Sequence, residues 1–288
     1  MVGVVVFWLL GCGPSVVAEC VDGYASASSV AQGETIRFHV SSSSASCAYE
    51  LHIYREGASA RERVTTVPGL QATFHPCVNA TGVPVENDED ALGCGWPLAY
   101  ELAIPQSWAS GMYVVDLVSD GDPPLGFSAY IFFVVKEDQP GSTSDILFHL
   151  PTNTWQAYNP YDDWSLYTTP QAVKLTFDRP YKRCWDVCYY RWERPLIRWM
   201  ATEGYPVEYC ASEDLHNDST LLEQYNLVLS VGHDECSWMP SSMVEVTIPR
   251  SLRIPCTVRF ATRMADERWS GTRTTTRVIP CLASIRSS

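Results

Sequence analysis

The sequence predicts an antiparallel β-sandwich followed by an α/β domain with a parallel sheet, and three observations support this fold class. Residues 20–139 contain short runs in which apolar and polar side chains alternate, which is the pattern of half-buried strands. Residues 136–145, KEDQPGSTSD, have the polar, Pro, Gly and Ser composition of a linker. Residues 146–249 then contain the order strand, helix, strand, helix, strand, which is typical of a doubly wound sheet.

The first 18 residues, MVGVVVFWLLGCGPSVVA, have the features of a secretory signal. Their apolar core is too short to span a bilayer, and no other segment of the sequence is long and apolar enough to do so. Two processing sites remain open: cleavage after Ala18, or acylation of Cys12 in LLGC, which is similar to a bacterial lipoprotein box. We therefore expect a secreted, periplasmic or cell-surface protein that contacts a membrane only through a lipid anchor.

The strands of the sandwich are predicted from side-chain alternation. In ETIRFHVSS, Ile36, Phe38 and Val40 share one face of the predicted strand, and polar residues occupy the other. The other predicted strands are AYELHIYREG (48–57), LAYELAI (98–104), MYVVDLV (112–118) and SAYIFFVV (128–135). Because these runs are short and bounded by turn residues, they favour an antiparallel sandwich.

The chain contains 11 cysteines, which indicates an oxidising compartment in which disulfides persist. Cys77 and Cys94 flank a polar insertion, and Cys20 and Cys47 could join the first strands, although the sequence leaves the connectivity open. CWDVC (184–188) has no second cysteine pair at metal-binding spacing. A local disulfide is therefore expected there in place of a zinc site.

The elements of the α/β domain are predicted from runs and helical spacing. ILFHL (146–150) is a continuous apolar run, as expected for a strand buried on both faces. In residues 189–205, Trp192, Leu196 and Trp199 occur at helical spacing, and Gly204 is a suitable stop. The remaining predicted elements are a strand in PVEYCA (206–211), a helix in HNDSTLLEQY (216–225) and a strand in NLVLSVG (226–232).

The parallel sheet predicts where ligands bind, because open sheets of this kind bind them beyond the carboxyl ends of the strands. The loop PTNTWQAYN (151–159) follows the first strand, and GHDE (232–235) follows the third. Trp, Tyr, Asn and Asp are concentrated in 151–167, which indicates a pocket or a packed surface. His233 and Glu235 have an alternative role, which is to cap the following helix through its dipole.

The net charge of −13 excludes nucleic acid as an expected partner, because no basic face is available to neutralise phosphates. Cysteine catalysis is also not expected. Cys236 follows Glu235 in the same crevice, but the Gly-x-Cys-x-Gly turn that would expose a nucleophile is missing around it.

Several motifs in order resemble the large (beta) subunit of N,N-dimethylformamidase and its relatives. They are LFHLPTNTWQAYNPYDDWSLY, TFDRPY, RWERPLIRWMATEGYPVEYCASEDLH and YNLVLSVGHDE, and the upstream GYASASSVAQGETIRFHVSSSSASCAYELHIYREG is similar to the Ig-like sandwich of the same family. The resemblance covers roughly residues 20 to 236. It implies a domain similar to class I glutamine amidotransferases but without their cysteine nucleophile, and an amidohydrolase with one iron held by two tyrosines and a glutamate.

The resemblance assigns the metal ligands to Tyr158, Tyr181 and Glu235, with Tyr161, Tyr167, Tyr189 and Tyr190 as nearby alternatives to Tyr181. A free phenol has a pKa of roughly 10, so only a strongly acidic metal would bind two phenolates at neutral pH. Two phenolates and one carboxylate would balance a mononuclear ferric ion. We expect His233 or Asp234 to move a proton and Asn159 to orient water or the substrate carbonyl.

The C-terminal part departs from the family pattern. The family usually has Tyr-Trp after the glutamate, where this chain has Cys236 and Ser237. Residues 250–288 contain eight arginines and no lysine, and strand alternation is clear only in CTVRFAT. Because a doubly wound sheet normally has more than three parallel strands, the α/β domain is predicted to be truncated. A reading-frame error near residue 236 and a genuine basic tail are the two alternatives.

Two functions are therefore predicted from the sequence. The first is a secreted iron amidohydrolase that hydrolyses the C–N bond of a small amide substrate. The second is a non-catalytic surface protein in which the sandwich binds a partner and the α/β part is degenerate. The sequence leaves open whether the protein forms a homo-oligomer.

Overall fold

The computed structural model describes residues 20–77, 81–82, 93–119, 129–169, 172, 174–182, 189–218, 220–234, 244–247 and 257–262. The predicted signal in 1–18, the motif in 184–188, Glu235, Cys236 and most of the arginine-rich tail lie outside the described residues. No helix in the described part of the chain is both long and apolar enough to cross a membrane.

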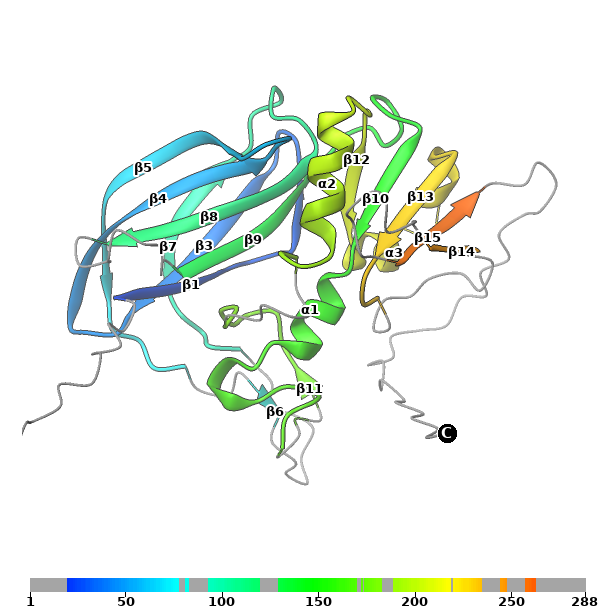
Figure 1. The fold of residues 1–288 in the computed structure, drawn as a ribbon. Coiled ribbons are helices and arrows are strands. Elements are labelled where there is room, and N and C mark those ends of the chain that lie inside the picture. The colour runs from blue at the N-terminus through cyan, green and yellow to red at the C-terminus, as the bar shows by residue number, and fades with distance from the viewer. Residues whose placement is uncertain are drawn as a thin grey trace, which may run out of the picture.

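The sandwich consists of two packed sheets, as predicted (Figure 1). The smaller sheet has the order β1 (Val21–Ala25), β3 (Thr35–Ser42) and β7 (Leu98–Ala103). The larger sheet has the order β2 (Ser29–Ala31), β9 (Ala129–Lys136), β8 (Gly111–Ser119), β4 (Ser46–Glu56) and β5 (Arg61–Thr73). Ile36, Phe38 and Val40 are buried between the sheets, so the alternation predicted the core-facing side of β3.

Strand β5 was not predicted from the sequence. Its run RERVTTVPGLQAT has no clean alternation, and it includes Pro68, which cannot donate a backbone hydrogen bond. The strand lies at the edge of its sheet and pairs only with β4, where the register shifts between Tyr49 and Leu51. An edge position tolerates both features because one side of the strand needs no partner.

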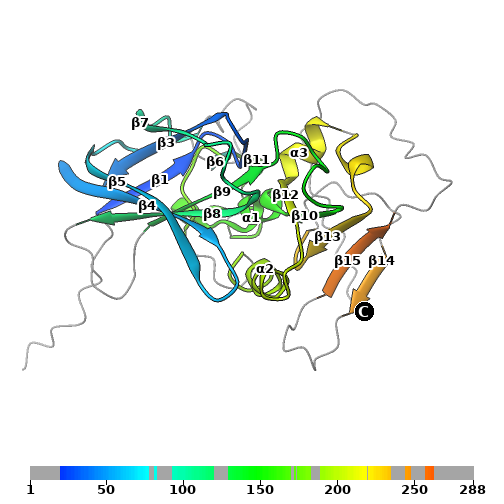
Figure 2. The same cartoon turned by 90° about the horizontal axis from the view of Figure 1, so that it is seen from above.

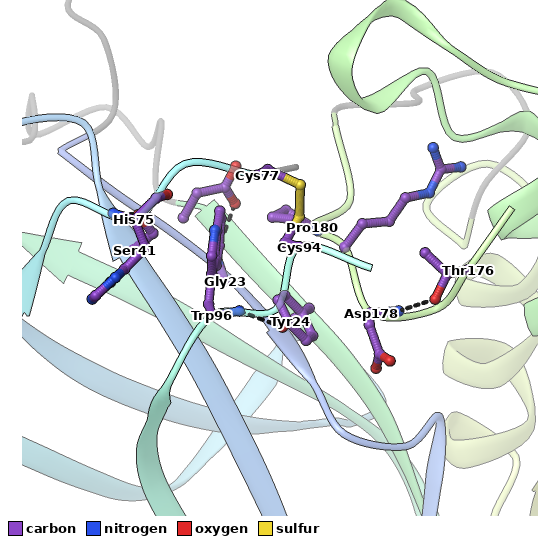
Figure 3. The surroundings of a disulfide bond; sticks show 12 residues. Gly23, Tyr24, Ser41, His75, Cys77, Cys94, Trp96, Thr176, Asp178 and Pro180 are labelled. Atoms are coloured by element: carbon purple, nitrogen blue, oxygen red, sulfur yellow. Dashed lines mark hydrogen bonds between the residues drawn. A yellow bond between two sulfur atoms is a disulfide. The ribbon is translucent and has the colours of Figure 1, made fainter. Parts of the chain in front are cut away.

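Both disulfides suggested by the cysteine positions are present, Cys20–Cys47 and Cys77–Cys94. Figure 3 shows the second bridge close to Tyr24 and Trp96, and the Trp96 backbone N–H donates to the Tyr24 hydroxyl at 3.2 Å. The backbone N–H of Cys94 donates to the carbonyl oxygen of Asp178 at 2.8 Å. This hydrogen bond therefore attaches the bridged sandwich loop to the chain segment that precedes Tyr181.

The second sheet has the order β12 (Glu208–Ala211), β10 (Ile146–Leu150), β13 (Leu227–Val231), β15 (Thr257–Thr262) and β14 (Val244–Thr247). The three predicted strands β12, β10 and β13 are parallel, which confirms their expected pairing. Strands β15 and β14 extend the sheet in antiparallel orientation, and β15 coincides with the alternating run CTVRFAT. The similarity to a class I glutamine amidotransferase stays a prediction.

Two helical predictions need correction. The segment 151–159, expected to be a loop, contains α1 (Thr152–Tyr158), and the polar side chains of Thr152, Thr154 and Gln156 are buried. This burial hid the amphipathic pattern. Among the described residues, no α-helix spans the expected range 216–225: α3 (Ser212–Asn217) ends at its start, and Leu221–Gln224 form only a 3-10 helix. An Asp214 carboxylate oxygen caps α3 by accepting the Ala211 backbone N–H at 2.8 Å.

The remaining elements are short, apart from the predicted helix α2 (Glu193–Thr202), which follows Trp192 and ends before Gly204. They are the 3-10 helices η1 (Tyr161–Asp163) and η2 (Leu221–Gln224) and a small sheet of β6 (Thr81–Gly82) and β11 (Lys174–Leu175). Figure 2 shows α2 beside the junction between the two large sheets.

The sandwich and the α/β part share one hydrophobic core. Met112 and Val114 on β8 and Val134 on β9 face away from the sandwich interior and pack with Phe148 and Leu196 of the α/β part. The predicted linker is also held in place, because the Glu208 carboxylate accepts the backbone N–H groups of residues 141, 143 and 144. The two parts are therefore joined by packing as well as by the chain.

A buried ionic cluster adds to this junction. Glu56, at the end of β4, has no exposed side-chain surface. Its carboxylate accepts hydrogen bonds from Arg198 Nε at 2.6 Å, from Arg194 Nε at 3.2 Å and from the Tyr189 hydroxyl. A sandwich carboxylate thus binds α2 and the chain before it.

Candidate functional site

Tyr158 and His233 lie together at the carboxyl ends of β10 and β13. Tyr158 is the last residue of α1, and its ring stacks on Tyr167 with centroids 3.9 Å apart. The Tyr158 and His233 ring centroids are 5.9 Å apart, and Trp192 approaches His233 at 5.6 Å. The sheet topology therefore brings an expected metal ligand close to an expected proton-transfer residue.

Gly232 makes the turn that presents His233. Its φ is +74°, a value that side-chain-bearing residues rarely adopt, and a Cβ at this position would lie 2.6 Å from the Trp192 Cβ. The glycine of GHDE is thus required by backbone conformation and by the close approach of the chain before α2.

Asn159 holds the Tyr181 segment against the end of α1. The fully buried Asn159 side chain donates from Nδ2 to the Pro180 carbonyl oxygen at 2.8 Å, and its Oδ1 accepts the Lys182 backbone N–H at 3.0 Å. Nδ2 also donates to Gln156 Oε1 at 3.1 Å. The amide therefore holds both flanks of Tyr181, and the expected contact of Asn159 with water or a carbonyl stays a prediction.

Tyr181 lies in a different set of contacts from Tyr158. Its ring is 5.5 Å from that of Phe132, at the junction with the sandwich. Burial raises the pKa of Tyr181 and the Glu213 carboxylate adds to this, whereas Arg179 and a hydrogen bond with Gln156 oppose it. The phenolate form therefore needs further positive charge.

Arg179 is a buried cation near Tyr181. Its guanidinium has no exposed surface, and in the described part of the chain it donates to the backbone oxygens of residues 156, 159 and 164 and to Gln156 Oε1. Burial lowers the pKa of Arg179 to about 10, and the phenols of Tyr181 and Tyr161 oppose this. The group stays charged at neutral pH and favours negative charge at Tyr181.

The other tyrosines considered as ligands have distinct surroundings. Tyr189 donates its hydroxyl to Glu56, and the Arg194 guanidinium lies 5.2 Å above the Tyr190 ring. Tyr161 packs with the cluster around Trp96. Tyr167 stacks directly on Tyr158, and the Tyr181 segment is attached to Asn159, the residue after Tyr158.

Asp234 is buried and accepts a hydrogen bond from Ser230 Oγ at 3.0 Å. Glu235, the expected third ligand, follows it outside the described residues. Within the described part of the chain, no group of three His, Cys, Asp or Glu side chains could hold a metal ion. The expected ligand set is of another kind, since two of its members are tyrosines. Of these two tyrosines, Tyr181 interacts electrostatically with the buried Arg179, whereas Tyr158 stacks on Tyr167.

Sequence reasoning missed Glu193, the first residue of α2. Its buried carboxyl group accepts from Trp155 Nε1 at 3.2 Å through Oε1, and Oε2 has no hydrogen-bond partner in the described structure. Burial raises the pKa of Glu193 to about 8, and the Asp234 charge adds to this. The sequence did contain a pattern that indicates burial of Glu193. Residues 193, 196, 197 and 200 form the buried face of the helix at i, i+3, i+4 and i+7.

A separate cleft of about 730 Å³ opens between the sandwich and the end of α2. Arg55, Trp108 and Tyr205 are among its lining residues, and none of the predicted site residues is. It lies at the N-terminal end of β12, whereas Tyr158 and His233 lie at the carboxyl ends of the parallel strands.

Comparison with known protein families assigns the chain to one of them. The family model described as N,N-dimethylformamidase beta subunit-like, C-terminal, matches residues 50–246. The chain belongs to this family. The match begins in β4, includes Tyr158, Tyr181 and Glu235, and ends before β15, so it covers most of the sandwich and the three parallel strands.

No curated protein matches the N,N-dimethylformamidase-like chain. A solved structure entitled "Structural basis of T cell specificity and activation by the bacterial superantigen toxic shock syndrome toxin-1" matches with 12% identity, 41% coverage of this chain, 98% coverage of the other and a TM-score of 0.25. A likeness at this level carries no argument about fold or function.

Proposed function

We propose that the protein is an iron-dependent amidohydrolase that hydrolyses the C–N bond of a small amide outside the cytoplasm. Membership of the N,N-dimethylformamidase-like family supports the reaction class. The observation that carries the proposal is the junction of Tyr158 with His233, together with the attachment of the Tyr181 segment to Asn159. Two disulfides are typical of an extracytoplasmic compartment.

Tyr158, Tyr181 and Glu235 would hold a single ferric ion. When bound, such an ion polarises an amide carbonyl and acidifies water. Arg179 supports the anionic form of Tyr181, and Asn159 keeps the Tyr181 backbone beside α1. The ring of Tyr158 is held by stacking on Tyr167, which restricts its orientation.

His233 is suited to transfer the proton. A neutral imidazole accepts a proton from the attacking water as the water oxygen bonds to the carbonyl carbon. The same proton passes to the nitrogen as the C–N bond breaks, and the amine leaves with its electron pair protonated. Trp192 and Tyr158 flank the imidazole and keep bulk water away from two sides of it.

Iron content, visible spectrum and hydrolysis of small amides test the proposal on purified protein. We expect iron near one equivalent, a broad phenolate-to-iron absorption band and release of amine. Tyr158→Phe should remove much of the band and abolish hydrolysis with little change in stability, because only a hydroxyl is lost. Glu235→Gln should lower the iron content more strongly, since it removes a charge that balances the ion.

Tyr161→Phe is the matched control, because Tyr161 packs with the Trp96 cluster, which does not include Tyr158 or His233. It should keep both the band and the activity. A colourless, iron-free and inactive wild type would instead support a non-catalytic surface protein.

A further inference from the structure

A chain of buried hydrogen bonds crosses the carboxyl edge of the parallel sheet. His149 lies on β10, between the parallel strands β12 and β13, and is directly beside Ser230 of β13 in the parallel register. Its Nδ1 is 3.3 Å from Ser230 Oγ, and its Nε2 is 3.2 Å from Ser212 Oγ at the start of α3. Ser230 Oγ in turn lies 3.0 Å from Asp234 Oδ2. These hydrogen bonds thus connect β10, β13 and the start of α3 to Asp234, the residue before Glu235.

The charge state of His149 sets the donor-to-acceptor direction of these hydrogen bonds. The imidazole is fully buried, and burial lowers its pKa to about 4 although Asp214 opposes this, so it carries one proton at neutral pH. Asp214 on α3 is the charge that opposes this lowering, Asp234 after β13 is reached through Ser230, and the buried Cys210 thiol lies beside His149 on β12.

The single proton on His149 determines which group donates and which accepts in each of these hydrogen bonds. Ser230 has a single hydroxyl proton and donates it to Asp234, so its oxygen accepts the Nδ1–H of His149. The Nε2 of His149 is therefore unprotonated and accepts the Ser212 hydroxyl proton. The Ser212 oxygen also accepts the Asn153 backbone N–H at 3.4 Å, which fixes its position at the base of α1.

We propose that His149 and Ser230 are positioning residues that hold Asp234 in the orientation required for amide hydrolysis. This inference rests on the proposed function. The hydroxyl of Ser230 fixes one oxygen of the Asp234 carboxylate, and His149 fixes the hydroxyl. The segment that carries His233 and Asp234 is thereby anchored to the neighbouring parallel strand β10. Partners of this kind set the orientation of the groups that contact a metal or substrate.

¹⁵N NMR of histidine-labelled full-length protein tests the direction of these hydrogen bonds. The measurement is practical because the protein has six histidines. We expect His149 to carry its proton on Nδ1 and to show no titration between pH 5 and pH 8. Ser230→Ala should change the tautomer, since Nδ1–H loses its acceptor. A His149 that titrates in this range, or that carries its proton on Nε2, would overturn the proposal.

Kinetics of amide hydrolysis test the positioning role. Ser230→Ala should lower kcat by about tenfold or more with little change in KM, and Ser230→Thr should restore it because the hydroxyl is kept. Ser110→Ala is the matched control: Ser110 is similarly buried, and its Oγ accepts the Tyr209 backbone N–H at 2.9 Å, a bond that is not part of the His149 hydrogen-bond chain. It should leave kcat unchanged.

The possible failures are distinguishable. An active wild type in which Ser230→Ala has the kcat of Ser110→Ala would overturn the positioning role and leave the proposed function standing. A wild type that hydrolyses no amide and binds no iron would overturn the proposed function and this role with it.

Discussion

Replacement of Glu193 by glutamine gives a quantitative test of the buried carboxyl group. Glu193 is 1% exposed, and its pKa rises from the ordinary value of 4.5 to about 8 because burial disfavours the carboxylate. Glutamine has nearly the same shape and can still accept the Trp155 Nε1–H through its amide oxygen. The substitution therefore removes the titration with little change in packing.

The sign of the pH effect follows from the raised pKa. The folded protein binds the Glu193 proton more tightly than the unfolded chain does, so this stabilisation is complete below pH 4.5 and is lost as the pH rises through about 8. Each pKa unit corresponds to 1.36 kcal/mol, so the shift from 4.5 to about 8 amounts to about 5 kcal/mol. Between pH 4 and pH 9, the free energy of unfolding of wild type should therefore fall by roughly this amount relative to that of Glu193→Gln.

Urea unfolding of both proteins at pH 4, 7 and 9 measures the difference. We expect the two free energies of unfolding to agree within about 1 kcal/mol at pH 4, and the variant to be the more stable at pH 9. Glu203→Gln, an exposed position just after α2, controls for the loss of a negative charge and should show no such trend. A stability difference that stays constant from pH 4 to pH 9 would refute the reasoning.

Three further predictions concern the junction and the Tyr181 segment. Glu56→Gln should lower the free energy of unfolding by about 3–5 kcal/mol in urea titrations, because it leaves two arginines of α2 without their buried carboxylate; a loss below about 1 kcal/mol would contradict this. Asn159→Ala should reduce the iron content, measured by elemental analysis, because Tyr181 is no longer held beside α1; full iron loading would count against the positioning role. The shared core predicts that the sandwich and α/β part unfold in one calorimetric transition, whereas a stable proteolytic fragment ending within 136–145 would show independent domains.

Local sequence patterns were sufficient to predict most of the strands. Alternation in β3 and β4 placed Ile36 and Leu51 in the core, since a strand buried on one face has a period of two residues. The continuous run of β10 predicted a strand covered on both faces, and its pairing with β12 and β13 is parallel as expected. The order of these strands also placed Tyr158 and His233 at the same edge before any contact was known.

Tertiary contacts decided the remaining features, because the sequence around each one gives no local signal for it. Strand β5 forms only because β4 offers a partner along its whole length, and α1 buries polar groups that bond to Arg179. The sequence alone could place Tyr181 near the motif, but its attachment to Asn159 depends on two backbone groups that fold back over α1. The raised pKa of Glu193 has the same origin: a carboxyl group at a helix start is ordinary in sequence, and only the surrounding core removes water from it.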